Sequence, residues 1–260
     1  MSKHLLHTYD MGEGVTAFST TRHGGASQGA YAQFNINHYC GDDEAHIATN
    51  RQTLATLLGI DTEDIVLPHQ THGTEVLLIS EAWHARPQAD RQRELEGIDA
   101  VMTAQLGLCI GVSTADCIPI LLHDPAHGAV AAIHAGWRGT VGRIAGKTVE
   151  AMRQAFATRP EALRAVIGPG ISREAFEVGD EVYEQFVQAG FDMAHIAERR
   201  DRWHLDLPRC NQLQLIEAGV PTNQICPSGI CTYRQADDYF SARRLGIASG
   251  RIYNGILLKT

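Results

Sequence analysis

Short apolar runs, separated by polar turns, fill the middle of the sequence. Three of these runs have the length and composition of buried strands: residues 108–113, 118–123 and 129–134. Between the second and third runs, residues 124–128 are of the types that favour a turn. The pattern predicts a hairpin, and a turn centred on Ala126 puts Ile118 opposite His134.

The second half of the chain alternates between helical and extended patterns. Apolar and small residues recur at helical spacing after Val141, and Thr140 stands in the position of an N-cap. Further helices are predicted at residues 179–189 and 207–218, with Gly219 as a C-terminal cap of the second. Short strands are predicted at residues 76–79, 164–168 and 252–258. Strands and helices mix without strict βαβ alternation, which favours an α+β fold of layered mixed sheets.

One polar segment interrupts this pattern between residues 82 and 96, where charged and polar side chains predominate. It follows the predicted strand at residues 76–79 and has the composition of an exposed surface loop. The sequence contains no internal repeat and no low-complexity tract. We therefore expect one domain, residues 1–260, with a polar surface insertion near residues 82–96.

The charge balance narrows the classes of partner. The 260 residues include 22 Lys and Arg against 30 Asp and Glu, which gives a net charge of −8. Such a chain repels phosphate backbones at long range, so we expect a small-molecule substrate and no nucleic acid. No run approaches the roughly 20 apolar residues that span a bilayer. Because residues 1–7 also lack the apolar core of a signal peptide, we expect no membrane partner and a cytoplasmic location.

The cysteines raise the question of metal binding. The six cysteines form no CxxC pair, which argues against the common structural zinc motifs, and a reducing cytoplasm disfavours disulfides. In the predicted hairpin, Cys117 lies one residue away from direct opposition to His134. A register shifted by one residue would bring the two side chains onto one face, about 5 Å apart. The pair is also consistent with a buried thiol beside a hydrogen-bonded imidazole.

A third candidate ligand, His72, stands just before Gly73 and an apparent strand. It follows His69 by three residues, so one or both histidines would face a common cavity. One thiolate and two imidazoles form a donor set that suits zinc or copper. Three protein ligands leave a fourth position open for water or substrate, as in catalytic rather than structural sites. The sequence thus predicts a metal site made of His72, Cys117 and His134.

Further positions have chemistry suited to a substrate pocket. Arg138, near the start of the helix predicted at Thr140, would form an anion site with exposed backbone N–H groups or would only solvate a loop. Asp116 is placed to orient a metal ligand or a substrate, or to cap a turn. Residues 239–244 combine aromatic and basic side chains, so they would stack a planar base and bind an anion, or pack beside a solvated face.

Three motifs together resemble those of the YfiH-like laccase-domain family, whose members are also known as polyphenol oxidases and peptidoglycan-editing factors. The motifs are Gln70-Thr71-His72-Gly73, Thr114-Ala115-Asp116-Cys117-Ile118-Pro119 and His134-Ala135-Gly136-Trp137-Arg138-Gly139. Shorter matches extend the resemblance over almost the whole chain: residues 34–37, 50–51, 167–171 and 240–243.

The resemblance implies a four-layer α/β/β/α fold with mixed sheets and a zinc site whose ligands, His72, Cys117 and His134, are also catalytic. It implies phosphorolysis of the purine nucleosides adenosine, inosine and methylthioadenosine, with phosphate as the second substrate and with adenosine deaminase activity alongside. Four residues are then assigned to substrate binding: Asn37, Arg138, Ser241 and Arg243.

Other functions stay open at this point. One alternative places Cu²⁺ in the same three-ligand site and makes the protein an oxidase of phenols. Another is hydrolysis of an amide in a cell-wall precursor, with Cys117 as nucleophile or metal ligand. A metal-sensing module without enzymatic activity is a further alternative. The polar segment at residues 82–96 departs from the family's pattern and bears on the rim of the pocket, and so on substrate preference.

Overall fold

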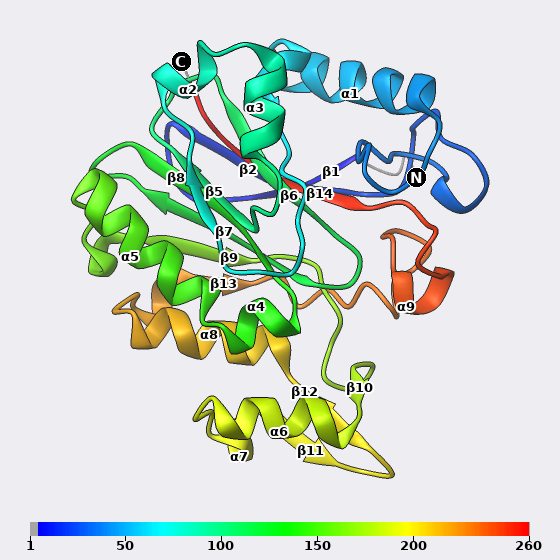
Figure 1. Ribbon diagram of the computed structural model, residues 1–260, viewed down its shortest axis with the longest axis vertical. Coiled ribbons are helices and arrows are strands. Elements are labelled where there is room, and N and C mark those ends of the chain that lie inside the picture. The colour runs from blue at the N-terminus through cyan, green and yellow to red at the C-terminus, as the bar shows by residue number, and fades with distance from the viewer. Residues whose placement is uncertain (1–4, 260) are drawn as a thin grey trace.

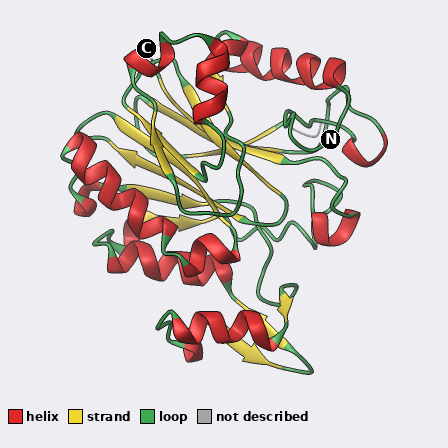
Figure 2. Cartoon of the chain, viewed as in Figure 1, coloured by secondary structure: helices red, strands yellow, loops and turns green. Residues whose placement is uncertain are grey.

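The computed structural model describes residues 5–259, so residues 1–4, which begin the N-terminal stretch considered above, and Thr260 lie outside the description. Two mixed sheets lie face to face, with helices on the outer face of each (Figure 1, Figure 2). The first sheet has the strand order β1 (Leu6–Tyr9), β2 (Val15–Thr20), β14 (Ile252–Leu258), β6 (Cys109–Thr114) and β3 (Ile65–Val66). The second has the order β13 (Ile225–Pro227), β9 (Arg164–Ile167), β7 (Ile118–Asp124), β8 (Ala129–Ala135), β5 (Ala100–Thr103) and β4 (Val76–Leu78).

Three apolar layers hold the sheets and helices together. Leu121 of β7 and Ile256 of β14 pack between the two sheets. Ile120 of β7 faces the opposite way, toward α5 (Ile144–Phe156) and α8 (Leu207–Glu217). The outer face of the first sheet packs against α1 (Glu44–Leu58). Phe18 of β2 and Leu54 of α1 belong to the same apolar cluster there. The predicted four-layer α/β/β/α arrangement is therefore confirmed.

The apolar runs in the sequence follow from this layering. Every residue of β7 and β8 is buried, because one face of the second sheet meets the first sheet and the other meets helices. A strand covered on both faces shows a continuous apolar run rather than an alternating pattern. None of the helices within residues 5–259 is long and apolar enough to cross a bilayer.

A small lobe lies below α8 in Figure 1. It contains a third sheet, β10 (Glu177–Val178), β12 (Trp203–Leu205) and β11 (Ala197–Arg199), with α6 (Asp180–Gln188) and α7 (Met193–Ile196). Phe186 of α6 is fully buried and belongs to the same apolar cluster as α5 and α8. The lobe is thus joined to the main body by a shared core.

The helix predicted from Thr140 onward differs from the observed one. A first short helix, α4 (Trp137–Val141), begins already at Trp137 with Gly136 as its N-cap, and α5 begins at Ile144. Between them, Arg143 has a left-handed backbone with φ of 64°. That conformation ends one helix and redirects the chain, and a pattern of apolar positions does not reveal such a break.

The polar segment at residues 82–96 is not an open loop, so this prediction was wrong. It forms α2 (Glu81–His84), which the Ser80 hydroxyl caps, and α3 (Gln88–Glu94). Trp83 and Leu95 are buried against the layer between the two sheets. Two apolar residues twelve positions apart anchor the segment, and so sparse a pattern has no visible helical period.

Candidate metal centre

The topology of the second sheet brings four chain segments to one edge. Strand β8 is antiparallel to both β5 and β7, and β4 is parallel to β5. The starts of β4, β5 and β7 therefore meet the end of β8. His72 precedes β4, Asp99 precedes β5, Cys117 precedes β7, and His134 is the penultimate residue of β8. Residues separated by more than sixty positions in the sequence are in this way neighbours.

The three predicted metal ligands converge at this edge. One ligand atom from each of His72, Cys117 and His134 lies within 4.8 Å of the others. The imidazole rings of His72 and His134 stand edge to face, with their centroids 4.9 Å apart. Burial decreases from His134, which is 3% exposed, through the half-buried Cys117 to the exposed His72. The cluster therefore has one side within the protein and one side accessible to a substrate.

The hairpin register differs from the predicted one by one residue. His134 lies opposite Pro119, and Ile118 lies opposite Ala135. The predicted turn centre was wrong because the loop contains four residues between Asp124 and Ala129. Opposite residues share a face, and Cys117 is two positions before Pro119. Cys117 and His134 are consequently diagonal neighbours on the same face.

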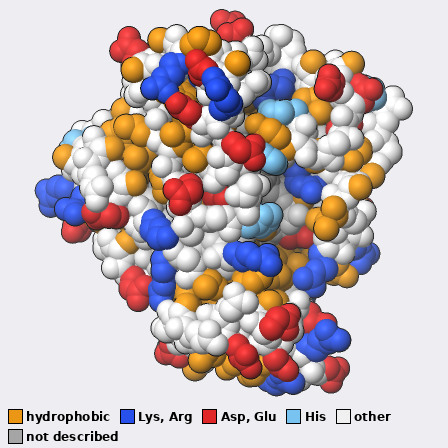
Figure 3. Space-filling model, viewed as in Figure 1, with side chains coloured by type: hydrophobic (Ala, Val, Ile, Leu, Met, Phe, Trp, Pro, Cys, Tyr) orange, Lys and Arg blue, Asp and Glu red, His pale blue; other side chains and the backbone are white. Residues whose placement is uncertain are grey.

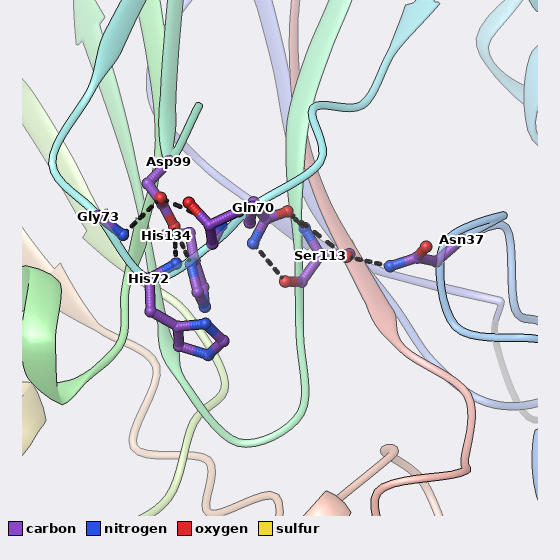
Figure 4. A network of polar contacts seen from close by, with 8 residues as sticks. Asn37, Gln70, His72, Gly73, Asp99, Ser113 and His134 are labelled. Carbon is purple, nitrogen blue, oxygen red and sulfur yellow. Dashed lines mark hydrogen bonds and ion pairs between the residues drawn. The ribbon is translucent and has the colours of Figure 1, made fainter. Parts of the chain in front are cut away.

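Asp99 is the acceptor that organises the cluster, and the sequence analysis did not identify it. Its carboxylate accepts hydrogen bonds from His134 Nδ1 at 2.7 Å and from the backbone N–H of His72 at 3.0 Å (Figure 4). It also accepts from the N–H groups of Gly73 and Thr71, at 2.6 and 3.3 Å. Because Nδ1 of His134 is engaged, Nε2 is the nitrogen left for a metal.

The carboxylate also explains an uncommon backbone conformation. His72 has φ of 65°, a left-handed value that side chains other than glycine seldom adopt. Three successive N–H groups, of residues 71 to 73, point at the oxygens of Asp99. Such a concave run of N–H groups binds an anion. Asp99 thus positions one ligand through its ring and another through its backbone.

Electrostatics favour the metal-binding form of the cysteine. Burial by itself raises the pKa of the Cys117 thiol, but the charge and hydrogen bonds of His134, with those of His72, lower it to about 6. Burial disfavours the charged imidazole, yet Cys117 and Asp99 raise the pKa of His134 to about 9. Hydrogen bonds from His134 and the Gly73 N–H outweigh burial and hold the pKa of Asp99 below its usual range. A thiolate is therefore stable here, and the thiolate is the form that ligates a metal.

Glycine is required directly beside the cluster. A Cβ atom on Gly136 would lie 3.0 Å from the Cys117 sulfur and 2.9 Å from Cδ2 of His72. Both contacts are closer than carbon and sulfur atoms normally approach. The backbone at Gly136 therefore forms one wall of the cluster, where α4 leaves β8.

The cluster lies in a cavity of about 840 Å³. The aromatic residues Tyr39, Trp137 and Phe176 contribute to its walls, and so do the basic residues Arg243 and Arg251. Figure 3 shows histidine side chains reaching the surface near the middle of one face, close to hydrophobic and basic groups. A pocket of this size and mixed lining holds a small molecule and leaves room for a second one.

Two of the four predicted substrate-binding residues line this cavity. Asn37 does so, and its amide donates to the Ser113 hydroxyl at 2.6 Å. Arg243 also lines the cavity, with its guanidinium 5.6 Å from the ring centroid of Phe176. The backbone N–H of Arg243 donates to Asp116 at 2.9 Å. Asp116 thus anchors the segment that carries Arg243 and does not orient a metal ligand.

The other two residues do not reach the cavity wall. Ser241 is fully buried, and its hydroxyl caps α9 (Ala242–Leu245) by accepting from the N–H of Arg244. Arg138 is exposed, with its guanidinium 4.2 Å from the ring centroid of Trp137. Trp137 itself lines the cavity, so Arg138 contacts the site through that ring.

Two further residues line the cavity although neither was assigned to the site from the sequence: Arg251 and His69. Arg251 lines the cavity, but its guanidinium is engaged by the backbone carbonyls of Ser249, Gly250 and Ile247. His69 also lines it, and its Nδ1 pairs with Glu96 at 2.7 Å. Glu96 does not line the cavity itself, and neither do residues 82–95. The segment at 82–96 therefore touches the rim through His69, by the carboxylate of Glu96 and by the backbone carbonyl of Leu95, which accepts from the His69 N–H at 2.9 Å.

The fold of two packed mixed sheets, with a His–Cys–His cluster in a cavity at one sheet edge, indicates a protein with one small-molecule site that can bind a metal. Residues 16–259 match the family described as multi-copper polyphenol oxidoreductase laccase. A crystal structure titled hypothetical protein YfiH, from Bacillus licheniformis, has a TM-score of 0.86 and 29% identity, and covers 94% of this chain and 93% of its own. The chain belongs to the YfiH-like laccase-domain family.

Two curated relatives have names that state an activity. A purine nucleoside phosphorylase from Bacteroides thetaiotaomicron is 46% identical over 247 residues, which cover 94% of this chain and 92% of the relative. Adenosine deaminase RL5, from an unknown prokaryotic organism, is 46% identical over 250 residues, which cover 95% of each chain. Both relatives are enzymes of purine nucleosides by name.

Proposed function

We propose that this protein is a zinc-dependent enzyme that cleaves adenosine, inosine and methylthioadenosine with phosphate and also deaminates adenosine. The observation that carries the proposal is the convergence of His72, Cys117 and His134 within 4.8 Å, in a cavity large enough for a nucleoside and phosphate. The names of the two relatives support the substrate class. A cytoplasmic location remains a prediction.

The donor set fits a transition metal. Two imidazoles and a thiolate suit zinc or copper and do not suit hard cations such as Mg²⁺. The hydrogen bond from His134 Nδ1 to Asp99 is the outer contact that metal-bound histidines usually make. When bound, the metal supplies Lewis-acid chemistry toward a substrate or water. The three residues are assigned as ligands, and through the metal they take part in catalysis.

Phosphorolysis also needs residues that bind the two substrates. We assign the phosphate to Arg243, which lines the cavity. Its guanidinium donates to the backbone carbonyl of Glu177 at 3.3 and 3.4 Å and forms no ion pair within residues 5–259. The phosphate oxygen forms a bond to the anomeric carbon as the glycosidic bond breaks, and the departing purine takes up a proton. Trp137 and Phe176 offer flat apolar faces for the purine.

Asn37 is assigned to hydrogen bonding with the nucleoside. Its side chain is fixed by the Ser113 hydroxyl and by the backbone N–H of Tyr39, at 2.6 Å each. A fixed amide binds polar atoms without losing further side-chain freedom. Ser241 and Arg138 act indirectly, Ser241 by capping the turn that carries Arg243 and Arg138 by holding the ring of Trp137.

A substrate screen tests the proposal. Protein loaded with one equivalent of zinc is incubated with adenosine, inosine or methylthioadenosine, with and without phosphate, and the products are separated by chromatography. We expect free base and a ribose 1-phosphate in equal amounts only when phosphate is present, and inosine from adenosine in either case. If neither free base nor inosine forms above the level of chelator-treated protein, the proposed activity is wrong.

The family's description favours one other function, the oxidation of phenols. A metal ion could be held by a group of three or more His, Cys, Asp or Glu side chains. Within residues 5–259, the only such group is His72, Cys117 and His134. A multi-copper reduction of oxygen requires several copper ions, so this ligand count favours the nucleoside enzyme. Copper-loaded protein assayed for oxygen uptake with a phenol decides between the two. The amidase alternative is included by adding a cell-wall precursor amide to the same screen.

A further inference from the structure

A second cavity, of about 320 Å³, lies between α1, α3 and β3. Figure 1 shows α1 and α3 close together above the first sheet. None of the three predicted metal ligands lines this cavity, although Tyr39 contributes to the walls of both cavities. The two cavities therefore share only Tyr39 among their lining residues, and the proposed reaction gives the second cavity no role.

Three buried nitrogen atoms on its lining residues have no hydrogen-bond partner: Arg51 Nη1, Trp83 Nε1 and Arg91 Nε. They come from three different helices, α1, α2 and α3. Buried polar groups in folded proteins nearly always have a partner, and each exception needs an explanation. All three are donors, so the missing partner is an acceptor.

The charges around the cavity point to an anionic acceptor. Within residues 5–259, no carboxylate forms an ion pair with Arg51 or Arg91. Arg51 donates only from Nη2, to the carbonyls of Thr62 and Ile65 at 3.2 and 2.9 Å. Arg91 has its guanidinium 5.6 Å from the ring centroid of Trp83 and its Nη1 3.4 Å from Nδ1 of His84. Two guanidinium groups at one cavity without a counter-charge are costly to bury.

Neighbouring side chains do not supply that counter-charge. Glu63 lines the cavity, but it is exposed and pairs with neither arginine. His38 lines the cavity as well, and burial, together with the positive charge of Arg51, lowers its pKa to about 4. A neutral imidazole adds no charge of its own. The cavity therefore keeps a positive potential from its two guanidinium groups.

We propose that this second cavity binds a phosphate-type oxyanion, either inorganic phosphate or the phosphate of a small monoester, through Arg51, Arg91 and Trp83. A guanidinium presents parallel N–H donors that match the oxygens of phosphate. The indole N–H of Trp83, which lacks a partner, is a further, neutral donor among the lining residues. The volume exceeds that of one phosphate, so a small sugar on the ester also fits. The proposal is independent of the reaction in the larger cavity.

Binding measurements on a variant with a weakened first cavity test this. In Arg243→Gln protein, the proposed phosphate contact of the large cavity is removed. Inorganic phosphate and ribose 5-phosphate are then titrated at constant ionic strength, by calorimetry and by phosphorus NMR. Into this background we introduce Arg91→Gln or Trp83→Phe, and Arg93→Gln as the matched control. Arg93 is on the same helix but is exposed and does not line the cavity.

We expect one saturable site in the Arg243→Gln background. Arg91→Gln should weaken binding at least about tenfold and Trp83→Phe about threefold, because a charged and a neutral hydrogen bond are lost. Arg93→Gln should leave the affinity unchanged. Tighter binding of ribose 5-phosphate identifies a monoester as the ligand, and tighter binding of inorganic phosphate identifies the free ion.

Two results would overturn the proposal. One is the absence of saturable binding of either anion. The other is an equal affinity in the Arg91, Trp83 and Arg93 variants, which would indicate only unspecific attraction to the helix. Thermal unfolding of each variant without anion shows whether it is folded. Trp83→Phe keeps the packing of a large ring, so its binding can be measured even if an arginine variant is unstable.

Discussion

Replacing Asp99 with asparagine removes the negative charge that orients His72 and His134, and it leaves the volume of the side chain almost unchanged. The carboxylate accepts from His134 Nδ1 and the His72 N–H through one oxygen, and from Gly73 and Thr71 through the other. An amide has one accepting oxygen, and its NH₂ group faces two donors whichever way it turns. Two N–H groups therefore lose their acceptor, and those of residues 71 to 73 are part-buried.

The magnitude follows from that count. A buried donor left without a partner costs about 1–3 kcal/mol, and a part-buried one costs less, so the two together should lower the free energy of unfolding by about 1–3 kcal/mol. The loss of the anion also releases His72 from its left-handed conformation and removes the acceptor that orients His134. Metal affinity should fall roughly tenfold to a hundredfold, as it does when the outer partner of a metal-bound histidine is removed.

Two measurements check this expectation. Urea unfolding at pH 7 of chelator-treated protein gives the stability, and competition with a chromophoric chelator gives the zinc affinity. Asp116→Asn is the matched control, because Asp116 accepts from Thr232 and Arg243 and not from a ligand. It should leave zinc affinity unchanged. If Asp99→Asn binds zinc as tightly as the unchanged protein, Asp99 does not orient the ligands and the reasoning fails.

Four further outcomes are expected. Cys117→Ala should lose both stoichiometric zinc binding and nucleoside turnover. The control Cys226→Ala, at an exposed cysteine outside the cavity, should keep both. If Cys117→Ala retains zinc, Cys117 serves only in packing. Arg243→Ala should lower kcat/KM for phosphorolysis by one to two decades, about 1.5–3 kcal/mol, and should lower kcat/KM for deamination less. Arg138→Ala should have a smaller effect on phosphorolysis than Arg243→Ala. Equal losses in both reactions of Arg243→Ala would contradict a phosphate-binding role. Burial raises the pKa of Asp124, but the hydrogen bonds from the ring and the backbone N–H of His127 outweigh it and hold that pKa below its usual range. Because the pKa of Asp124 is lower in the folded state than in the unfolded state, its contribution to stability is present above about pH 4 and is lost as the pH falls further. In Asp124→Asn, the free energy of unfolding measured in urea should therefore depend less steeply on pH in acid. Removing zinc should lower Tm by about 5–10 °C without unfolding, and zinc should restore it better than magnesium, which a thermal scan would measure.

The convergence of the three candidate metal ligands was predictable because their chemistry is specific. Few residue types bind zinc, and Cys117 and His134 flank a hairpin whose strands are visible as apolar runs. The exact register was not predictable, since it depends on how many residues the turn holds. The error was harmless, because a shift by one in either direction places both side chains on one face.

Asp99 could not be found in the same way. A carboxylate is the commonest surface group, and its partners at residues 71 to 73 and at His134 are distant in sequence. Only the position of Asp99 directly before a fully buried strand, β5, hinted at a special role. Arg138 was overvalued for a related reason. It adjoins a ligand motif, but helix α4 directs its side chain onto Trp137 and not into the cavity.

Two anchors hold the loop that carries His72, and together they connect the two sheets. On one side, Gln70 bonds both the N–H and the carbonyl of Ser113 in the first sheet, at 2.8 Å each. On the other, Asp99 binds the N–H groups of residues 71 to 73 and belongs to the second sheet's edge. Figure 4 shows both anchors along one short stretch of chain. His72, although exposed, is therefore fixed relative to His134 through a continuous set of hydrogen bonds. A site whose most exposed ligand is held in this way can open toward substrate without losing its geometry.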